Sequence, residues 1–160
     1  MDTPTPARES DSGTDLVVAA AAGLAAAIGA GVVWALIVKI SDYEIGVAAW
    51  GIGFLAGTAV VLAARRRKST TLAVVAVVAA LLGILLGKYL SFVFIVRDEL
   101  GESYGFLSGD TWNLFMDNKG IVFSFWDILW IGLAVVTAWR VAYPGEPEPD
   151  ERHEHEPESV

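Results

Sequence analysis

Three ionisable residues lie within or at the edges of long apolar segments and are the main candidates for chemistry in this chain. They are Glu44, Lys88 and Asp127. A charge near the centre of a bilayer costs at least about 2.5 kcal/mol, and less toward the edges, so such residues are usually paired or functional. The sequence therefore predicts that Lys88 pairs with Glu44 or with Asp127, and that Tyr43 and Tyr89 could contribute hydroxyl groups.

The same residues also have structural interpretations. Ser41 precedes Glu44 by three positions and Ser124 precedes Asp127 by three, which is the spacing of a helix-capping box. Lys88 could extend along its methylene groups until its ammonium reaches the lipid headgroups. A purely structural role is the simpler hypothesis, and a polar site for an ion, a proton or a lipid headgroup is the alternative.

Four apolar segments must position these residues. The chain has 160 residues, is 54% hydrophobic and has a mean hydropathy of +0.53. About 20 apolar residues in a helix span the hydrocarbon core of a bilayer. We therefore predict an all-α, polytopic membrane protein with four transmembrane helices in residues 15–143, at about 16–38, 42–64, 70–96 and 124–143.

The segments outside these helices are polar. Residues 1–14 and the acidic tail, residues 144–160, have a composition typical of disordered chain. Residues 97–120 form a mixed polar and aromatic outer loop, in which Trp112, Phe115 and Met116 could form one face of a short interfacial helix.

A cluster of bases predicts the orientation of the helices. It lies between the second and third apolar segments and consists of Arg65, Arg66, Arg67 and Lys68. Loops rich in Lys and Arg stay on the cytoplasmic side. With four spans, both termini are then cytoplasmic too. The richness in Ala and Val, together with the acidic tails, favours the plasma membrane of a prokaryote as the location.

Small residues recur at intervals of four along three of the predicted helices, so each helix has a smooth face. Such faces allow close approach of helix backbones in lipid. They could hold this bundle together, or one of them could bind a second copy or a partner helix. The glycines predicted to contribute are Gly23, Gly31, Gly53, Gly57, Gly83 and Gly87.

Several kinds of chemistry are disfavoured by the composition. The chain has no cysteine, which excludes disulfides, thiolate metal sites and cysteine nucleophiles. Both histidines, His153 and His155, lie in the acidic tail and supply too few ligands for a filled metal site. The basic cluster is short and adjoins a membrane helix, so nucleic-acid binding is not expected. We predict no cofactor, no metal and no catalytic residues.

Three groups of residues resemble a family of small prokaryotic membrane proteins with about four spans and uncharacterised activity. They are Tyr43-Glu44-Ile45-Gly46-Val47-Ala48-Ala49-Trp50-Gly51-Ile52-Gly53, then Gly87-Lys88-Tyr89, and then Asp127-Ile128-Leu129-Trp130 with Thr137-Ala138-Trp139-Arg140. The resemblance covers residues 25–142. It implies no activity, but it implies that the Tyr-Glu-Ile-Gly and Gly-Lys-Tyr segments belong to one recurring arrangement.

Two functional hypotheses follow. The first is a non-enzymatic assembly, scaffold or membrane-organising subunit, whose partners are the lipid bilayer and either further copies of itself or another membrane protein. The second is a small transporter or channel whose polar path includes Lys88, Glu44 and Asp127.

Overall fold

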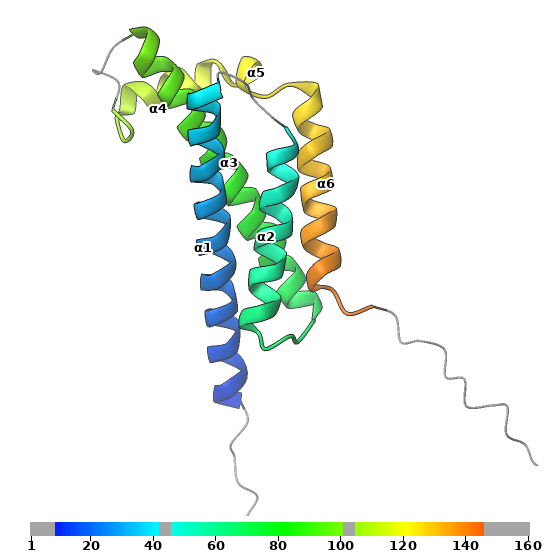
Figure 1. Ribbon diagram of the computed structural model, residues 1–160. Helices are drawn as coiled ribbons and strands as arrows, with labels where there is room; N and C mark the ends of the chain where they lie inside the picture. The colour runs from blue at the N-terminus through cyan, green and yellow to red at the C-terminus, as the bar shows by residue number, and fades with distance from the viewer. Residues whose placement is uncertain (1–8, 42–45, 101–104, 146–160) are drawn as a thin grey trace, which may run out of the picture.

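The computed structural model describes residues 9–41, 46–100 and 105–145, and within these ranges the chain forms helices and no strand (Figure 1). Three helices, α1, α3 and α6, are long and apolar enough to cross a membrane, whereas α2 is apolar but has only 17 residues. The helices are α1 (Glu9–Ser41), α2 (Val47–Ala63), α3 (Thr70–Leu100), α4 (Gly109–Asp117), α5 (Lys119–Val122) and α6 (Phe125–Ala142).

The four longer helices alternate in direction along the chain and form a bundle, in which α1 packs along α3 and α2 packs along α6, each of these two pairs running parallel (Figure 1). The short helices α4 and α5 lie across one end of the bundle, here called the cap end. The start of α1, the α2–α3 connection and the end of α6 lie at the opposite end, here called the basic end because it carries residues 65–68. Two contacts join these segments: Arg67 Nη1 lies 3.2 Å from Asp15 Oδ2, and the Ser69 amide donates to the Ala142 carbonyl at 3.2 Å.

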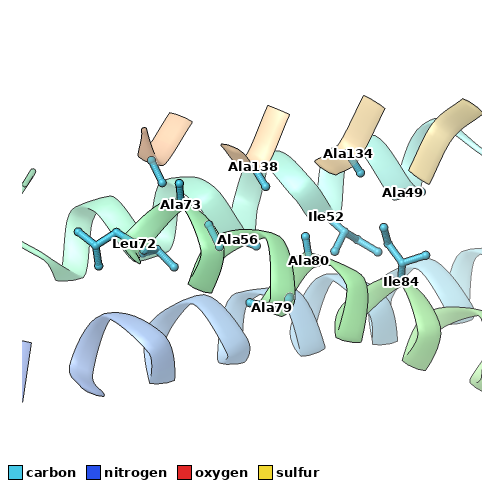
Figure 2. Close-up of a cluster of buried hydrophobic side chains, with 14 of the residues drawn as sticks. Ala49, Ile52, Ala56, Leu72, Ala73, Ala79, Ala80, Ile84, Ala134 and Ala138 are labelled. Carbon is cyan, nitrogen blue, oxygen red and sulfur yellow. The ribbon is translucent and has the colours of Figure 1, made fainter. Parts of the chain in front are cut away.

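Most buried side chains of the bundle are small, with Trp34 as the largest buried side chain, and many large apolar side chains face outward. In Figure 2 alanines from α2, α3 and α6 line the interior along the length of these helices, together with Ile52 and Ile84. The outer surface carries large side chains such as Val33, Phe54 and Leu82, each roughly half exposed. A water-soluble protein rarely exposes so much apolar surface. Together with the three long apolar helices, this distribution indicates a membrane protein.

Glycines bring α1 and α3 into backbone contact. A Cβ atom added to Gly31 would lie 2.5 Å from the Gly83 carbonyl oxygen, and one added to Gly83 would lie 2.6 Å from the Ala27 carbonyl oxygen. A Cβ on Gly87 would lie 2.7 Å from Cε3 of Trp34. No side chain larger than hydrogen fits at these positions unless the helices move apart.

The other packing glycines join further pairs of helices. A Cβ on Gly53 would overlap the Ala134 backbone, and one on Gly57 would lie 3.1 Å from the Ala138 carbonyl oxygen, both in α6. A Cβ on Gly23 would overlap Val60 of α2. All six glycines that the sequence analysis singled out therefore lie at contacts inside this bundle, so their faces are not free for a second copy or a partner helix.

Two helix starts differ from those predicted. Helix α1 already begins at Glu9, within the stretch for which the sequence predicted disorder, and it continues to Ser41, whose hydroxyl donates to the Ile37 carbonyl at 2.7 Å. Helix α2 begins at Val47 rather than near residue 42. A Cβ on the preceding residue, Gly46, would overlap the Trp130 ring, so α6 constrains where α2 can start. Residues 42–45, including the predicted cap residue Glu44, lie outside the described residues.

The end of α2 is a Schellman motif built without glycine. The Arg66 amide donates to the Val61 carbonyl at 2.8 Å and the Arg65 amide donates to the Leu62 carbonyl at 3.1 Å. Both arginines have positive φ angles, 55° for Arg65 and 62° for Arg66. The first of these positions is usually glycine, because a Cβ atom makes the left-handed conformation unfavourable.

Candidate polar site at the cap end

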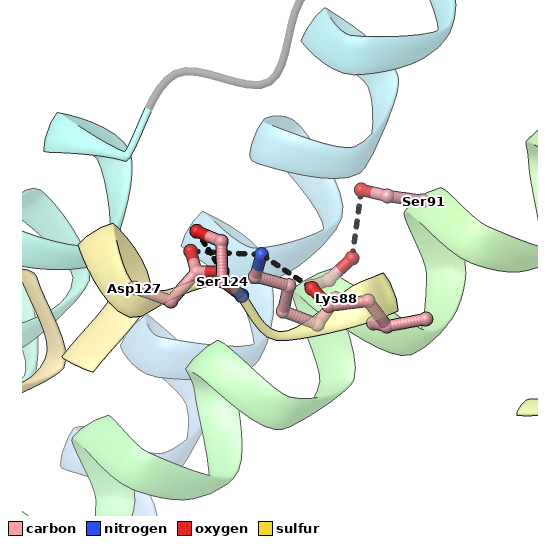
Figure 3. Close-up of polar contacts among 6 residues, drawn as sticks. Lys88, Ser91, Ser124 and Asp127 are labelled. Carbon is pink, nitrogen blue, oxygen red and sulfur yellow. Dashed lines mark hydrogen bonds and ion pairs between the residues drawn. The ribbon is translucent and has the colours of Figure 1, made fainter. Parts of the chain in front are cut away.

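Lys88 is buried in α3 close to the cap end, and among the described residues its ammonium group contacts α5 and α6. Only 2% of its surface is exposed. Its Nζ atom lies 2.8 Å from Asp127 Oδ1 in α6 and donates to the Val122 carbonyl at 3.0 Å (Figure 3). The predicted pairing of Lys88 with Asp127 is therefore present in the structure, and it ties α3 to the α5–α6 connection.

Asp127 has a second role at the start of α6. Its Oδ2 atom accepts the Ser124 amide at 2.7 Å and the Ser124 hydroxyl at 3.1 Å, and its own amide donates to the Ser124 carbonyl at 3.0 Å. A capping box is thus present at the predicted position. One carboxylate oxygen serves the cap and the other serves the ion pair, so the two interpretations of Asp127 are compatible.

Aromatic rings surround the ammonium group. The Nζ atom of Lys88 lies 5.8 Å from the Trp34 ring centroid and 5.7 Å from that of Phe123. Rings at this distance attract a cation and exclude water from it. In such surroundings the attraction between Lys88 and Asp127 is stronger than on a surface exposed to water.

Tyr89 lies next to Lys88 in the sequence but belongs to a different cluster. Its hydroxyl donates to the Phe106 carbonyl at 2.8 Å, and its ring centroid lies 5.3 Å from that of Phe115 and 5.8 Å from that of Trp112. Tyr89 thus fastens α4 and the segment before it onto α3, rather than joining the ion pair. The remaining predicted site residues, Glu44 and Tyr43, lie outside the described residues.

A pocket of about 530 Å³ borders Lys88 at the cap end. Its rim carries charges of both signs, including Lys39, Asp98 and Glu99, while Val38 and Ile95 contribute apolar walls. Lys39 Nζ lies 4.9 Å from the Phe94 ring centroid, which holds the end of α1 against α3. In the part of the chain that is described, no group of three or more His, Cys, Asp or Glu residues could hold a metal ion.

The sequence analysis missed three partners of Lys88. The Val122 carbonyl could not be found from residue types, because any residue has a backbone carbonyl. Trp34 and Phe123 carried a better signal, since tryptophan and phenylalanine near a membrane lysine are natural cation–π partners. Gly87 also signals the approach of Trp34, because it leaves space beside Lys88 for a large ring.

The chain was compared with known proteins at the level of family, sequence and structure. No protein-family model, curated protein or solved structure matches it. The resemblance to small four-span prokaryotic membrane proteins therefore stays a prediction. Among the described residues, Lys88 and Asp127 form an ion pair whose charges balance. Through Lys88 this pair connects α3 with α5 and α6, and it lies beside the pocket at the cap end.

Proposed function

We propose that this chain is a four-span protein of a prokaryotic plasma membrane, with both termini in the cytoplasm, and that it acts as a non-enzymatic assembly or scaffold subunit. The fourth span would be α2, whose 17 residues reach about 26 Å, close to the lower limit for a transmembrane helix. Its outward side chains, Phe54, Leu55 and Leu62, are roughly half exposed and suit contact with lipid.

The orientation is supported by the position of the bases. The start of α1 and the end of α6 lie at the same end of the bundle as residues 65–68 (Figure 1). Retention of this basic end in the cytoplasm would place both termini there.

Labelling can test the orientation directly, because the natural chain has no cysteine. Asn113→Cys lies in α4 at the cap end, and Thr70→Cys lies at the basic end; both side chains are exposed. A membrane-impermeant maleimide should label Asn113→Cys in intact cells, and it should label Thr70→Cys only after the cells are permeabilised. The reverse pattern, or labelling of both in intact cells, would contradict the proposed topology.

The observation that carries the assembly role is an apolar surface at the cap end. Phe125, Trp126 and Ile128, at the start of α6, are 79%, 67% and 68% exposed. Trp112 and Met116 of α4 are also exposed, whereas Phe115 between them is buried against α3. Aromatic residues are enriched both at membrane–water interfaces and in the centres of protein interfaces.

Mild-detergent extraction followed by mass measurement tests this role. The full-length protein should migrate as a homo-oligomer or with a stoichiometric partner, and Phe125→Ala/Trp126→Ala should release the monomer. Phe54→Ala, which removes a half-exposed ring from α2, is the matched control and should leave the complex intact. A wild-type protein that is monomeric and without a partner would contradict the assembly role.

A small transporter or channel is the second candidate, because Lys88 borders the pocket at the cap end. In that role Lys88 would exchange Asp127 for a transported ion or proton. The double variant Lys88→Met/Asp127→Asn removes both charges of this ion pair together. Loss of ion or proton flux into liposomes by this folded variant would favour transport, and absence of flux in the wild-type protein would contradict it.

A further inference from the structure

A second pocket lies at the basic end of the bundle, away from the Lys88–Asp127 pair. It has a volume of about 630 Å³ and lies between α1, the α2–α3 connection and the start of α3. Its polar lining includes Asp15, Arg67, Lys68 and Ser69, and its apolar lining includes Leu16 and Leu72. The pocket thus places cationic groups next to apolar walls at the point where the apolar helices begin.

The charges of this pocket favour an anion. Arg67 and Lys68 contribute two cations and Asp15 one carboxylate. Arg67 pairs with Asp15 at 3.2 Å, but 66% of its side chain is exposed, so solvent weakens this pair. The guanidinium can therefore donate hydrogen bonds to a further anion. Arg65 and Arg66, in the same connection, add positive potential without lining the pocket.

The start of α3 adds to the same preference. Ser69 precedes α3, and its hydroxyl accepts the Leu72 amide at 3.2 Å. The amino-terminal end of a helix carries partial positive charge, which here lies beside Arg67 and Lys68. A phosphate group would find a guanidinium and an ammonium there, both of which form strong charge-assisted hydrogen bonds with phosphate.

We propose that this pocket binds the phosphate headgroup of an anionic glycerophospholipid. The inference rests on the proposed membrane function, because the lipid would come from the leaflet next to the basic end. A lipid fits better than free phosphate, since Leu16 and Leu72 line the pocket and can contact the glycerol and the first acyl carbons. Basic residues next to membrane helices are attracted to anionic lipids.

Two matched pairs of substitutions separate a site from general surface attraction. Arg67→Gln/Lys68→Gln removes two charges that line the pocket, and Arg65→Gln/Arg66→Gln removes two charges from the same connection outside it. The full-length protein in detergent is titrated with phosphatidylglycerol and with phosphatidylcholine, and bound lipid is counted by native mass spectrometry. Thermal unfolding establishes that each variant is folded.

The wild-type protein should prefer phosphatidylglycerol. The Arg67→Gln/Lys68→Gln variant should bind it about tenfold more weakly, and the Arg65→Gln/Arg66→Gln variant should bind it with at most about a threefold loss. Asp15→Asn should tighten binding, because it releases Arg67 from its carboxylate partner. This pattern would support the site.

Four results would overturn it. They are an equal loss in both double variants, no preference over phosphatidylcholine, competition by soluble glycerol phosphate as effective as by the lipid, and phosphatidylglycerol binding that appears only when the acids of residues 146–158 are changed to amides. The last would mean that the acidic tail, which follows α6 at the same end, fills the pocket. Each result leaves the topology and assembly proposals to their own tests, because labelling and complex mass do not depend on this pocket.

Discussion

Replacing Lys88 with methionine should destabilise the bundle far more than a surface substitution, because it leaves Asp127 buried without its counter-charge. Lys88 and Asp127 have side-chain exposures of only 2% and 11%, and their charged atoms lie 2.8 Å apart. Removal of one member of a buried pair typically costs about 3–5 kcal/mol. We expect Lys88→Met to lower the free energy of unfolding by about 3 kcal/mol. This value is at the lower end of that range because Asp127 keeps both hydrogen bonds to Ser124.

The double variant Lys88→Met/Asp127→Asn should recover most of this loss. Methionine keeps the volume of the lysine stem, and the asparagine oxygen can still accept the Ser124 amide. We expect Asp127→Asn alone to cost about 3 kcal/mol, because the buried Lys88 ammonium loses this carboxylate, and the double variant only about 1 kcal/mol, because both charges of the pair are removed together. The coupling between the two sites would then be well above the roughly 0.5 kcal/mol within which independent mutations add.

Unfolding free energies can be measured by titrating the protein in mild-detergent micelles with a denaturing detergent and following the helical circular dichroism signal. Lys119→Met is the matched control, because Lys119 is exposed, and it should change stability by no more than about 0.5 kcal/mol. Strict additivity of the two single losses in the double variant would refute the reasoning, as would a Lys88→Met protein as stable as the control.

Three further predictions concern helix contacts, and unfolding free energies measured in the same way check each of them. Gly53→Leu should prevent the close approach of α2 to α6 and cost more than about 3 kcal/mol, whereas Gly132→Leu, where an added Cβ meets nothing within 4 Å, should be near neutral; similar losses for both would contradict the packing. Ser124→Ala should cost about 1 kcal/mol, because the capping box loses the Ser124 hydroxyl while the Ser124 amide still donates to Asp127, and an unchanged stability would show that the hydroxyl contributes nothing. Trp50→Phe removes the 2.9 Å hydrogen bond from the indole to Thr137 and should cost about 0.6 kcal/mol, with Thr137→Val giving the same loss if the bond is the cause.

Local signals in the sequence predicted the start of α6 but not that of α2. Ser124 and Asp127 form their capping box at the predicted place because the cap depends only on residues within one turn. The similar box predicted at Ser41 and Glu44 stays a prediction, because Glu44 lies outside the described residues. Helix α2 starts at Val47, after Gly46, which is constrained by the Trp130 ring. That constraint comes from a residue more than 80 positions away, so no local pattern contains it.

Only part of the candidate site could be predicted from the sequence. Apolar segment order placed Lys88 and Asp127 toward the same end of the bundle, which was enough to propose their pairing. Helical geometry could also have excluded Tyr89, because consecutive residues in a helix point about 100° apart. The other contacts of the site depend on how each helix is rotated about its own axis. The rotation of α1 turns Trp34 toward Lys88, and it depends on the glycine contacts between α1 and α3.

The two left-handed arginines at the end of α2 imply a conflict between folding and biosynthesis. A residue with a Cβ atom in this conformation costs roughly 1 kcal/mol relative to glycine, so Arg65→Gly would make the finished bundle more stable. On the proposed topology, the α2–α3 connection stays in the cytoplasm because it is rich in positive charge, and the same change would remove one of these charges. A laboratory selection for heat resistance alone should therefore favour glycine at residue 65, and the selected proteins should insert in mixed orientations more often than the natural chain.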